Sequence, residues 1–273
     1  MAVIKDSGLS GETTVQVNGE DIIIPPCDLW SDEPPLESDL HREQIELLLA
    51  CLKWLWRNRT DFYATGNLTI FYSPEHITTR EFRGPDFFVV LGCENHPRKS
   101  WVLWAEQGKY PNVIVELLSN STAKIDRGVK KELYQDTFRT PEYFWFHPDT
   151  LEFQGFRITG GEYQPIELNA EGWLWSQQLE LFLGVYESRL RFFSPNKQLI
   201  PTPEERSQAA QQQMEAEQQQ KELAQQQVEA ERQQKELAQQ QVQQLLDKLR
   251  DLGVDPGLDG ELRGFASTSI IHQ

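Results

Sequence analysis

Two acidic residues stand beside short apolar runs, where they could bind a divalent metal. Asp86 directly precedes the run from Phe87 to Leu91, and Glu116 lies near the end of a second run that begins at Val113. Short runs bounded by Gly, Pro and Asn are typical of buried strands. If the two strands are neighbours, the carboxylates converge although about 30 positions separate them. Two hard oxygen ligands with water suit Mg²⁺ or Mn²⁺ better than Zn²⁺.

Each residue also has a purely structural interpretation. Pro85-Asp86 before a strand is common in turns, and a lone Glu in an apolar strand is often a paired charge, because buried ionisable groups mark function only in some cases. The segment after Glu116 favours function. A Ser/Asn/Thr stretch over 119–122 supplies helix caps, and helical spacing follows, so that Lys130 and Tyr134 share one face.

These segments resemble the Uma-two family of restriction endonuclease-like proteins, within the PD-(D/E)XK nuclease superfamily. The resemblance extends from about residue 36 to about residue 203. It rests on Arg83-Gly84-Pro85-Asp86, Val115-Glu116-Leu117-Leu118-Ser119, Ser121-Thr122, Asp126 to Lys130, Tyr134, and Pro141-Glu142-Tyr143-Phe144-Trp145. It implies an α/β fold with a restriction-endonuclease-like core, in which helices flank a mixed central sheet.

The chain departs from the superfamily at one position. The superfamily pattern is Glu-x-Lys, and Leu118 stands where the lysine would be. The resemblance implies that the following helix supplies this lysine as Lys130, with Lys131 the weaker candidate. A lysine on its flexible stem can reach the same point from another backbone position. A lysine on an amphipathic helix is also often merely solvated, and that alternative stays open.

Metal-dependent endonuclease activity, the hydrolysis of nucleic-acid phosphodiester bonds, is the function that the resemblance implies. Asp86 and Glu116 would ligate one or two Mg²⁺ or Mn²⁺ ions, with the main-chain carbonyl of Leu117 as a further ligand. Lys130 would orient the attacking water or stabilise the transition state.

The superfamily often takes another carboxylate from its first helix, which we expect here over about 39–57. Glu43 and Glu46 share a face of that helix, and we favour Glu46 as the metal ligand. His41, at the helix start, also matches the family. A histidine at this place is more often a capping or packing residue, so we assign it no role.

The charge of the chain limits how it could bind nucleic acid. The formal net charge is −16, which is unusual for a protein that grips DNA broadly, because such affinity comes from lysine and arginine at phosphates. We still expect a nucleic-acid partner, with DNA favoured. Basic residues that could line a cleft near the two motifs are Arg80, Arg83, Lys124, Arg127, Lys130 and Lys131.

The cysteines and the apolar runs indicate a cytoplasmic protein. Cys27, Cys51 and Cys93 have no paired spacing and no nearby histidine set, so we expect reduced thiols and no zinc site. The first residues lack an apolar signal core, and no run reaches the length of a membrane helix.

Four regions follow from the pattern along the chain. Residues 1–35 look like an extended arm against the core, and 36–203 form the nuclease-like domain. In that domain we expect the helix to bury Ile45, Leu48, Leu49, Leu52 and Leu55. We expect strands over 62–71, 86–91, 102–104, 113–118 and 143–146, and a hairpin around Gly160-Gly161. Residues 253–273 have no periodic pattern from Leu258 on, and we expect disorder there.

The region 204–252 is rich in glutamine and repeats itself. Lys-Glu-Leu-Ala-Gln-Gln-Gln-Val occurs at 221–228 and again at 235–242, an offset of two heptads that predicts a long helix with a coiled-coil seam. A homodimer through this helix and a solitary solvated helix both fit the pattern.

Three classes of function remain open. The first is the metal-dependent nuclease. The second is a nuclease-fold protein that binds nucleic acid or a protein partner without cutting, which the missing Glu-x-Lys and the acidic composition favour. The third is a scaffold that oligomerises through the coiled coil.

Overall fold

The computed structural model of the chain describes residues 4–6, 13–17, 20–33, 36, 38–73 and 84–253. The chain divides into two units, which meet between Arg206 and Ser207. No helix in the described ranges is long and apolar enough to cross a membrane.

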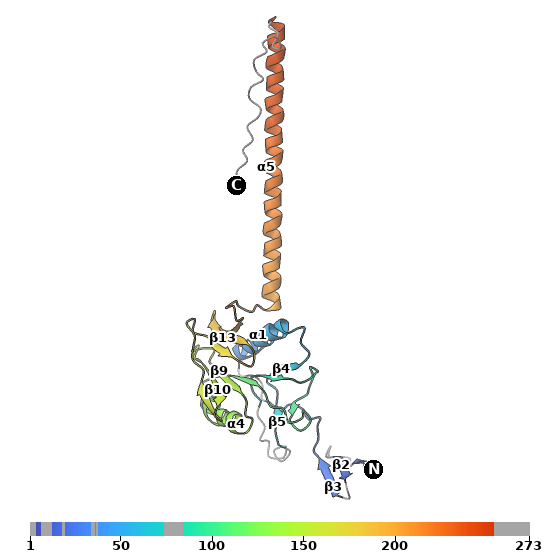
Figure 1. The fold of residues 1–273 in the computed structure, drawn as a ribbon, viewed down its shortest axis with the longest axis vertical. Helices are drawn as coiled ribbons and strands as arrows, with labels where there is room; N and C mark the ends of the chain where they lie inside the picture. Colours follow the sequence, from blue (N-terminus) through green and yellow to red (C-terminus); the bar gives the residue numbers. More distant parts are fainter. Residues whose placement is uncertain are drawn as a thin grey trace. The chain divides into compact units, whose positions relative to one another are not determined.

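A six-stranded mixed sheet forms the centre of the first unit (Figure 1). Its strand order is β11-β10-β9-β8-β6-β4, in which β8 and β9 are parallel and the other neighbours antiparallel. The predicted α/β fold with a mixed central sheet is therefore confirmed. The strands are β4 (Phe62–Gly66), β6 (Phe87–Leu91), β8 (Val113–Leu117), β9 (Glu142–Phe146), β10 (Phe153–Thr159) and β11 (Glu162–Pro165).

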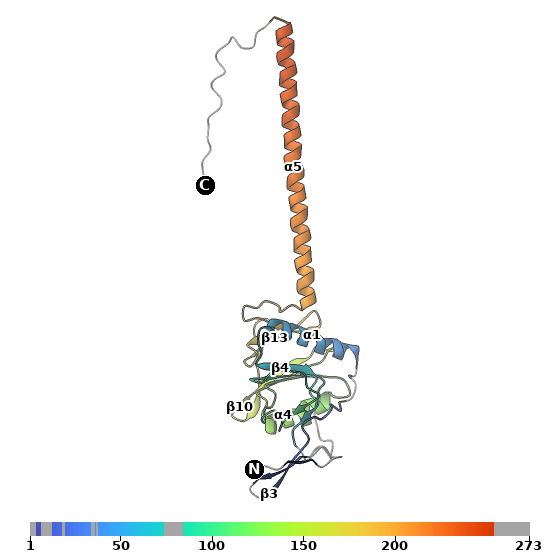
Figure 2. The ribbon, with the colours of Figure 1, turned by 90° about the vertical axis from the view of Figure 1, so that its right-hand side faces the viewer.

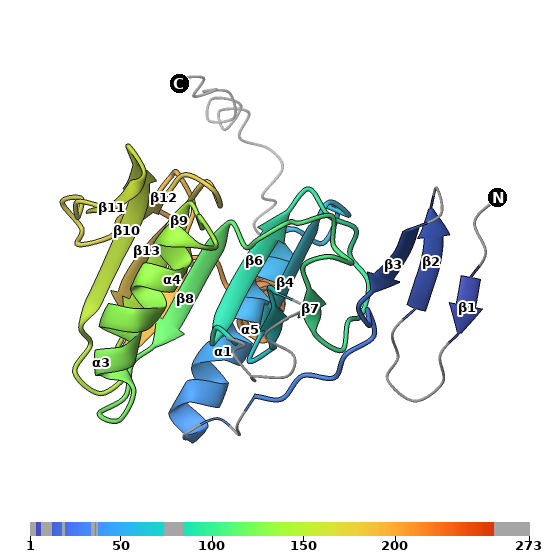
Figure 3. The same cartoon turned by 90° about the horizontal axis from the view of Figure 1, so that it is seen from below.

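Helices cover the sheet on opposite faces (Figures 2 and 3). The helix α1 (Asp39–Leu55) packs on one face together with a small antiparallel sheet. That sheet consists of β12 (Leu174–Ser176), β13 (Leu181–Tyr186) and β14 (Arg189–Phe193), none of which we predicted. The other face carries a helical segment in three parts, α3 (Ala123–Ile125), the π-helical turn η1 (Asp126–Lys130) and α4 (Lys131–Asp136).

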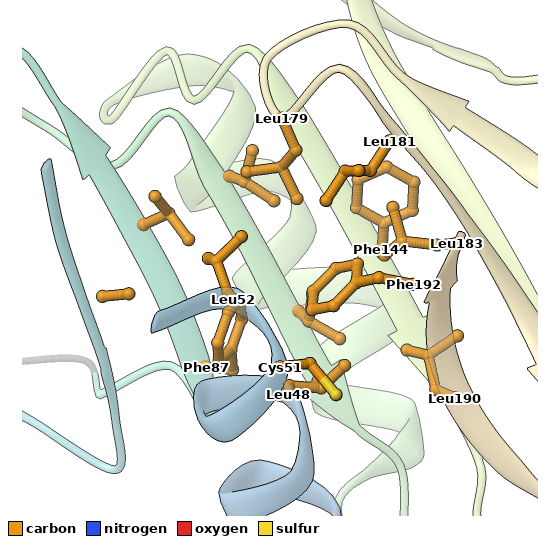
Figure 4. Close-up of a cluster of buried hydrophobic side chains, with 14 of the residues drawn as sticks. Leu48, Cys51, Leu52, Phe87, Phe144, Leu179, Leu181, Leu183, Leu190 and Phe192 are labelled. Atoms are coloured by element: carbon orange, nitrogen blue, oxygen red, sulfur yellow. The ribbon is translucent and has the colours of Figure 1, made fainter. Parts of the chain in front are cut away.

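Alternation along the strands builds two separate cores. Phe87 and Val89 of β6 join the cluster beneath α1, which Figure 4 shows. Phe88 and Val90 point the other way and join the cluster that contains Tyr134 of α4. Because successive side chains in a strand point to opposite faces, nearly every residue of such a central strand is buried.

The first predicted helix is confirmed, with a correction at its end. Ser38 caps it, since the Ser38 hydroxyl accepts a 3.3 Å hydrogen bond from the His41 N–H. Ile45, Leu48 and Leu52 are buried as predicted. Leu49 is only partly buried and Leu55 is exposed, because the helix ends at Leu55 and the stripe turns away from the sheet there.

Two predicted strands are shorter than expected. The run 62–71 is two strands, β4 and β5 (Ile70–Phe71), because Asn67 adopts a left-handed φ of 48° between them. The strand expected at 102–104 is β7 (Trp101–Val102), and it pairs in parallel with β5. The predicted hairpin is confirmed as β10 and β11, where Gly160 and Gly161 take positive φ values of 64° and 97°.

The N-terminal region contains strands of its own. β1 (Ile4–Asp6), β2 (Thr13–Val17) and β3 (Glu20–Ile24) form a three-stranded antiparallel sheet. Further along, the extended segment 26–33 contacts the nuclease-like domain, where the hydroxyl of Ser100 donates to Leu29 O at 2.7 Å and Trp104 Nε1 donates to Pro26 O at 3.2 Å. Some of our predictions lie outside the described residues. They concern the basic residues Arg80 and Arg83 and the tail beyond Gly253.

The predicted long C-terminal helix is confirmed as α5 (Pro203–Asp251), which has 49 residues. Its first turn belongs to the first unit, where Glu205 pairs with Arg191 at 2.7 Å.

Candidate active site

The antiparallel pairing of β6 with β8 brings the two predicted carboxylates together. Phe87 lies opposite Val115 in this pair, so Asp86 and Glu116 are the next residues across from each other. The Asp86 N–H donates to Glu116 Oε2 at 3.3 Å, and Asp86 Oδ2 accepts from the Leu117 N–H at 2.7 Å. Each carboxylate is therefore held by the backbone of the strand that carries the other.

Strand alternation sets the face on which these groups lie. Glu116 has the same parity as Ile114 and Leu118, which belong to the core cluster beneath α4. Asp86 likewise has the parity of Phe88. Both acids therefore point toward the helical segment that follows β8.

Lys130 reaches the carboxylates from that segment. Its Nζ lies 3.1 Å from Glu116 Oε1 and 3.0 Å from Asp126 Oδ1. Lys130 ends the π-helical turn η1, and single π turns inside helices occur frequently at functional sites. The ammonium group is thus held between two carboxylates, one at a strand end and one on its own helical segment.

Two tyrosines border the cluster formed by Asp86, Glu116, Asp126 and Lys130. The Tyr134 hydroxyl donates to Glu116 Oε1 at 2.6 Å, and Tyr134 lies one turn beyond Lys130 on the same helix face. The Tyr143 hydroxyl donates to the main-chain oxygen of Asp126 at 2.9 Å. Both tyrosines are fully buried, so they fix the cluster from the side away from solvent.

The first helix supplies a histidine to the cluster. His41 Nε2 lies 3.1 Å from Leu117 O, and His41 Nδ1 lies 2.8 Å from the Ser38 hydroxyl. A carbonyl oxygen can only accept, so the proton is on Nε2 in the neutral ring and Nδ1 accepts from Ser38. His41 therefore positions the carbonyl that we expected to bind metal.

The structure does not bring the expected helix carboxylate to this place. The Glu46 side chain is 61% exposed and pairs with Arg42 at 3.1 Å, and Glu43 pairs with Arg189 at 2.7 Å. Glu46 lies on the solvent face of α1 because it is five positions from His41, and at about 100° per position this places it about 140° around the helix axis from the cluster.

A small cavity of about 110 Å³ opens onto the cluster. Gly84 lies at its wall, where an added Cβ would be 2.2 Å from Cδ of Glu33, so a side chain at this position would displace the Glu33 carboxylate. The lining residues are Glu33, Leu36, His41, Asn67, Gly84, Asp86, Leu117, Thr122, Asp126 and Lys130.

We missed two acids of this cavity, Asp126 and Glu33. Asp126 could have been predicted from the sequence, because it precedes Lys130 by four residues and so lies on the same face of the helical segment. Glu33 could not have been predicted. It follows no strand and enters the site only through the extended segment 26–33, where its Oε1 accepts from the Thr69 hydroxyl at 2.9 Å.

Burial raises the pKa of each carboxyl group that faces Lys130. Loss of hydration raises the pKa of Glu116 to about 7, against the attraction of Lys130. Burial and the neighbouring Glu116 raise the pKa of Asp126 to about 6, and burial also raises that of Asp86. Burial alone would lower the pKa of Lys130, but the three carboxylates outweigh it and raise that pKa, so the lysine stays charged.

The donor set suits a hard divalent cation. Three carboxyl groups face a single ammonium group in a buried place, and Lys130 Nζ, at 3.0 Å, is the partner of Asp126 Oδ1. Within the part of the chain that the structure describes, no three His, Cys, Asp or Glu side chains converge enough to form a metal site by themselves. A cation here would therefore bind to one or two carboxylates, a main-chain oxygen and water, which is the usual coordination of Mg²⁺.

The predicted basic residues after Glu116 are distributed over three places. Lys130 lies in the cluster, whereas Lys131 Nζ lies 3.6 Å from the ring centroid of Phe156. Lys124 and Arg127 line a separate groove of about 720 Å³ with His147, and Arg127 pairs there with Glu152 at 2.5 Å.

Comparison with known proteins identifies the class of protein. Residues 29–186 match the Uma2 family, which is described as "Putative restriction endonuclease". The chain belongs to the Uma2 family, as the resemblance in its sequence indicated.

One solved structure similar to this chain is a crystal structure described as a putative nuclease belonging to DUF820 from Anabaena variabilis. It is 13% identical, with a TM-score of 0.40, and the match covers 60% of this chain and 80% of that one. None of the curated proteins compared with the chain matches it.

Proposed function

We propose that this protein is a metal-dependent endonuclease with a restriction-endonuclease-like core, which hydrolyses phosphodiester bonds in nucleic acid. The observation that carries the proposal is the convergence of Asp86, Glu116 and Lys130, from two strands and a helix, at a cavity. Family membership supports the same class of activity.

The groups around Asp86 have separate roles in this proposal. Asp86 and the carbonyl of Leu117 would hold Mg²⁺ or Mn²⁺, with Glu116 as the second carboxylate. A bound divalent cation supplies Lewis acidity, which lowers the pKa of a water molecule and offsets charge on the scissile phosphate. Lys130 stabilises negative charge that develops on the phosphate. His41 keeps the Leu117 carbonyl oriented through the hydrogen bond at Nε2.

The position of Lys130 accounts for the missing Glu-x-Lys. Leu118 is fully buried in the core beneath α4, where a lysine would lose its hydration. Lys130 brings an ammonium group to within 3.1 Å of Glu116 from the helix instead. The cluster thus has the same three chemical groups as the superfamily pattern, with the cation on another element.

The substrate that we propose is DNA, and RNA is the alternative substrate to test beside it. Lys124 and Arg127 offer charges for phosphate in the groove beside η1. Because the chain carries a net charge of −16 and the groove offers only these two cations for phosphate, binding should be weak and should fall only slightly as salt rises.

A cleavage assay on mixed DNA and RNA substrates tests the proposal. With Mg²⁺ or Mn²⁺ at low salt, the full-length protein should cut at least one substrate, and a chelator should stop cleavage. Asp86→Asn should abolish cleavage and leave the fold intact, since it removes the charge of a ligand but keeps its shape. Cleavage by Asp86→Asn at the wild-type rate would rule out Asp86 as a metal ligand.

One observation favours a protein of the nuclease fold that binds without cutting. Lys130 already pairs with both Glu116 and Asp126, so the buried charges have partners without a metal ion. Such a protein would bind nucleic acid or a protein partner equally well with Mg²⁺ and with a chelator, and it would show no cleavage in either.

We also propose that α5 associates with the same helix of a second copy as a coiled coil, forming a homodimer. The heptad offset of its repeat and the exposure of its apolar residues support this.

Cys51 and Cys93 are buried free thiols, which suits the reducing cytoplasm that we propose as the location.

A further inference from the structure

The helix α5 exposes apolar side chains that recur on one face among alanine and charged residues, and it also exposes Leu223 and Leu237 beside that face. Among the described residues 207–253 none is buried, and Val228, Val242 and Leu245 are 66%, 57% and 61% exposed. The two copies of the eight-residue repeat begin at Lys221 and Lys235, two heptads apart, so each presents the same face of the helix. This face is the surface that a second helix would cover.

Charged residues interrupt this face in a fixed order. In a heptad abcdefg, the a positions hold Met214, Lys221, Val228, Lys235 and Val242. The d positions hold Glu217, Ala224, Glu231, Ala238 and Leu245. Within this stretch, lysine therefore occupies the seam only at a, and glutamate only at d.

A parallel dimer in register would place like charges together. Each a or d residue of a parallel coiled coil faces its own copy, so Lys221 would face Lys221 and Glu231 would face Glu231. Lys235 and Glu217 would do the same. Like charges held against each other in a seam are strongly unfavourable, although the leucines from Leu245 onward would pack well.

An antiparallel dimer removes this conflict, because a positions then face d positions. When Val228 faces Ala224 of the second copy, Lys221 faces Glu231 and Lys235 faces Glu217. In the same register Met214 faces Ala238 and Val242 faces Ala210. If the second helix is shifted by one heptad in either direction, Val228 faces a glutamate and both lysines face alanines. If it is shifted by two heptads, only one of the two lysines faces a glutamate.

This register also uses the whole helix. It places Leu249 of one copy beside Pro203 of the other, and α5 extends from Pro203 to Asp251. The register chosen by charge and the register that gives full overlap are therefore the same. In this register Leu245 faces Ser207 and Leu249 faces Pro203.

We propose that two copies of the chain associate through α5 as an antiparallel coiled coil in this register, an inference that rests on the self-association of α5 proposed above. At about 1.5 Å per residue, the two Pro203 ends would then be about 70 Å apart.

Cysteine cross-linking of the full-length protein tests the orientation. Two variants, Met214→Cys and Ala238→Cys, are made in a Cys27→Ser background, because Cys27 is the exposed thiol among the three. The variants are oxidised separately and after mixing. The antiparallel register predicts a disulfide-linked dimer only in the mixture, because residues 214 and 238 face each other between copies.

The other outcomes overturn the proposal in distinguishable ways. Cross-linking of each variant to itself, with none gained on mixing, would show that the helices associate in parallel, so that association holds and orientation fails. A monomeric mass for the unmodified protein in sedimentation, with no cross-link, would remove the dimer as well.

Charge reversal gives an independent readout of the register. Lys221→Glu should weaken the dimer at least tenfold, because the new carboxylate at position 221 would face Glu231, and adding Glu231→Lys in the same chain should restore it. In a parallel dimer the single change replaces one like pair by another and has little effect. Arg250→Glu, at a b position away from the seam and its flanks, changes the net charge equally and should leave the dimer unchanged.

Discussion

At the scale of single residues, the site depends on how several carboxylates share one ammonium group. Lys130 Nζ lies within 3.1 Å of Glu116 and 3.0 Å of Asp126, and Asp86 lies beside Glu116. Removing the lysine leaves buried carboxylates uncompensated, so it changes both the charge at the phosphate and the protonation of the acids.

Lys130→Ala should lower the turnover of cleavage by roughly 100-fold or more, the scale for losing one electrostatic stabiliser. Lys131→Ala is the matched control, because its ammonium group lies against the ring of Phe156. It should have a much smaller effect. Single-turnover kinetics with saturating Mn²⁺ measure both, and a larger loss for Lys131→Ala would contradict the choice of Lys130 as the catalytic lysine.

Glu116 should make the metal-free protein less stable as pH rises. Its folded-state pKa of about 7 lies above its ordinary value of 4.5, so its stabilising contribution is fully present below pH 4.5 and is lost as pH rises through about 7. Between pH 5 and pH 8 the free energy of unfolding should fall by a few kcal/mol relative to Glu116→Gln, which cannot ionise. Chemical denaturation in chelator measures this, and a constant difference across that range would contradict it.

Residue types and run boundaries were sufficient to predict that Asp86 and Glu116 lie close together, because each stands at or near the end of a short apolar strand. Helical spacing likewise pairs Lys130 with Tyr134, and both contact Glu116. The same spacing could not choose between the faces of α1. Glu46 is exposed and His41 is buried at the site, and this depends on which side of the helix meets the sheet.

At the scale of elements, the site depends on the register of β6 against its neighbours. Gly66 of β4 lies opposite Phe87, and the backbone packs tightly there. A Cβ at Gly66 would be 2.3 Å from Cγ2 of Ile45 and 2.6 Å from the main-chain oxygen of Asp86. A side chain at this position would therefore displace the strand end that carries Asp86.

Gly66→Ala should reduce the free energy of unfolding by about 1–3 kcal/mol and also reduce cleavage. Gly128→Ala is the control, because nothing lies within 4 Å of its added Cβ and alanine favours helix. It should keep stability or raise it slightly. Thermal unfolding of both variants tests this, and equal stability of Gly66→Ala and wild type would mean that β4 does not hold Asp86 in place.

The elements that could be predicted are those with a long or complete pattern. The apolar stripe of α1, the buried run of β8 and the Gly160-Gly161 hairpin each carry such a pattern. The break at Asn67 depends on one left-handed residue, and β12 has only three residues, so neither gives a period to detect.

At the scale of the whole molecule, the boundary before the tail is set by a buried arginine. The Arg191 side chain is 5% exposed and pairs with Glu205, which lies in the first turn of α5. The composition change at Pro203 therefore marks the start of the helix but not the end of the packed unit.

A chain that ends after Arg206 should fold, keep any cleavage activity and sediment as a monomer. A chain that ends at Pro203 should lose on the order of 2 kcal/mol of stability, because Arg191 loses its charged hydrogen-bond partner. Denaturation and sedimentation of both chains decide this. Equal stability of the two would show that the Arg191–Glu205 pair does not matter, and a dimeric chain ending at Arg206 would show that α5 is not what holds two copies together.

The location of a bound metal tests the central claim, that the cluster around Asp86 is a divalent-metal site. Anomalous diffraction from crystals of the full-length protein soaked in Mn²⁺ measures it. We predict a peak in the cavity within bonding distance of the Asp86 carboxylate and the Leu117 carbonyl oxygen, and no such peak in Asp86→Asn crystals. An empty cavity at a Mn²⁺ concentration that supports cleavage, or a peak at another place in the chain, would contradict the claim.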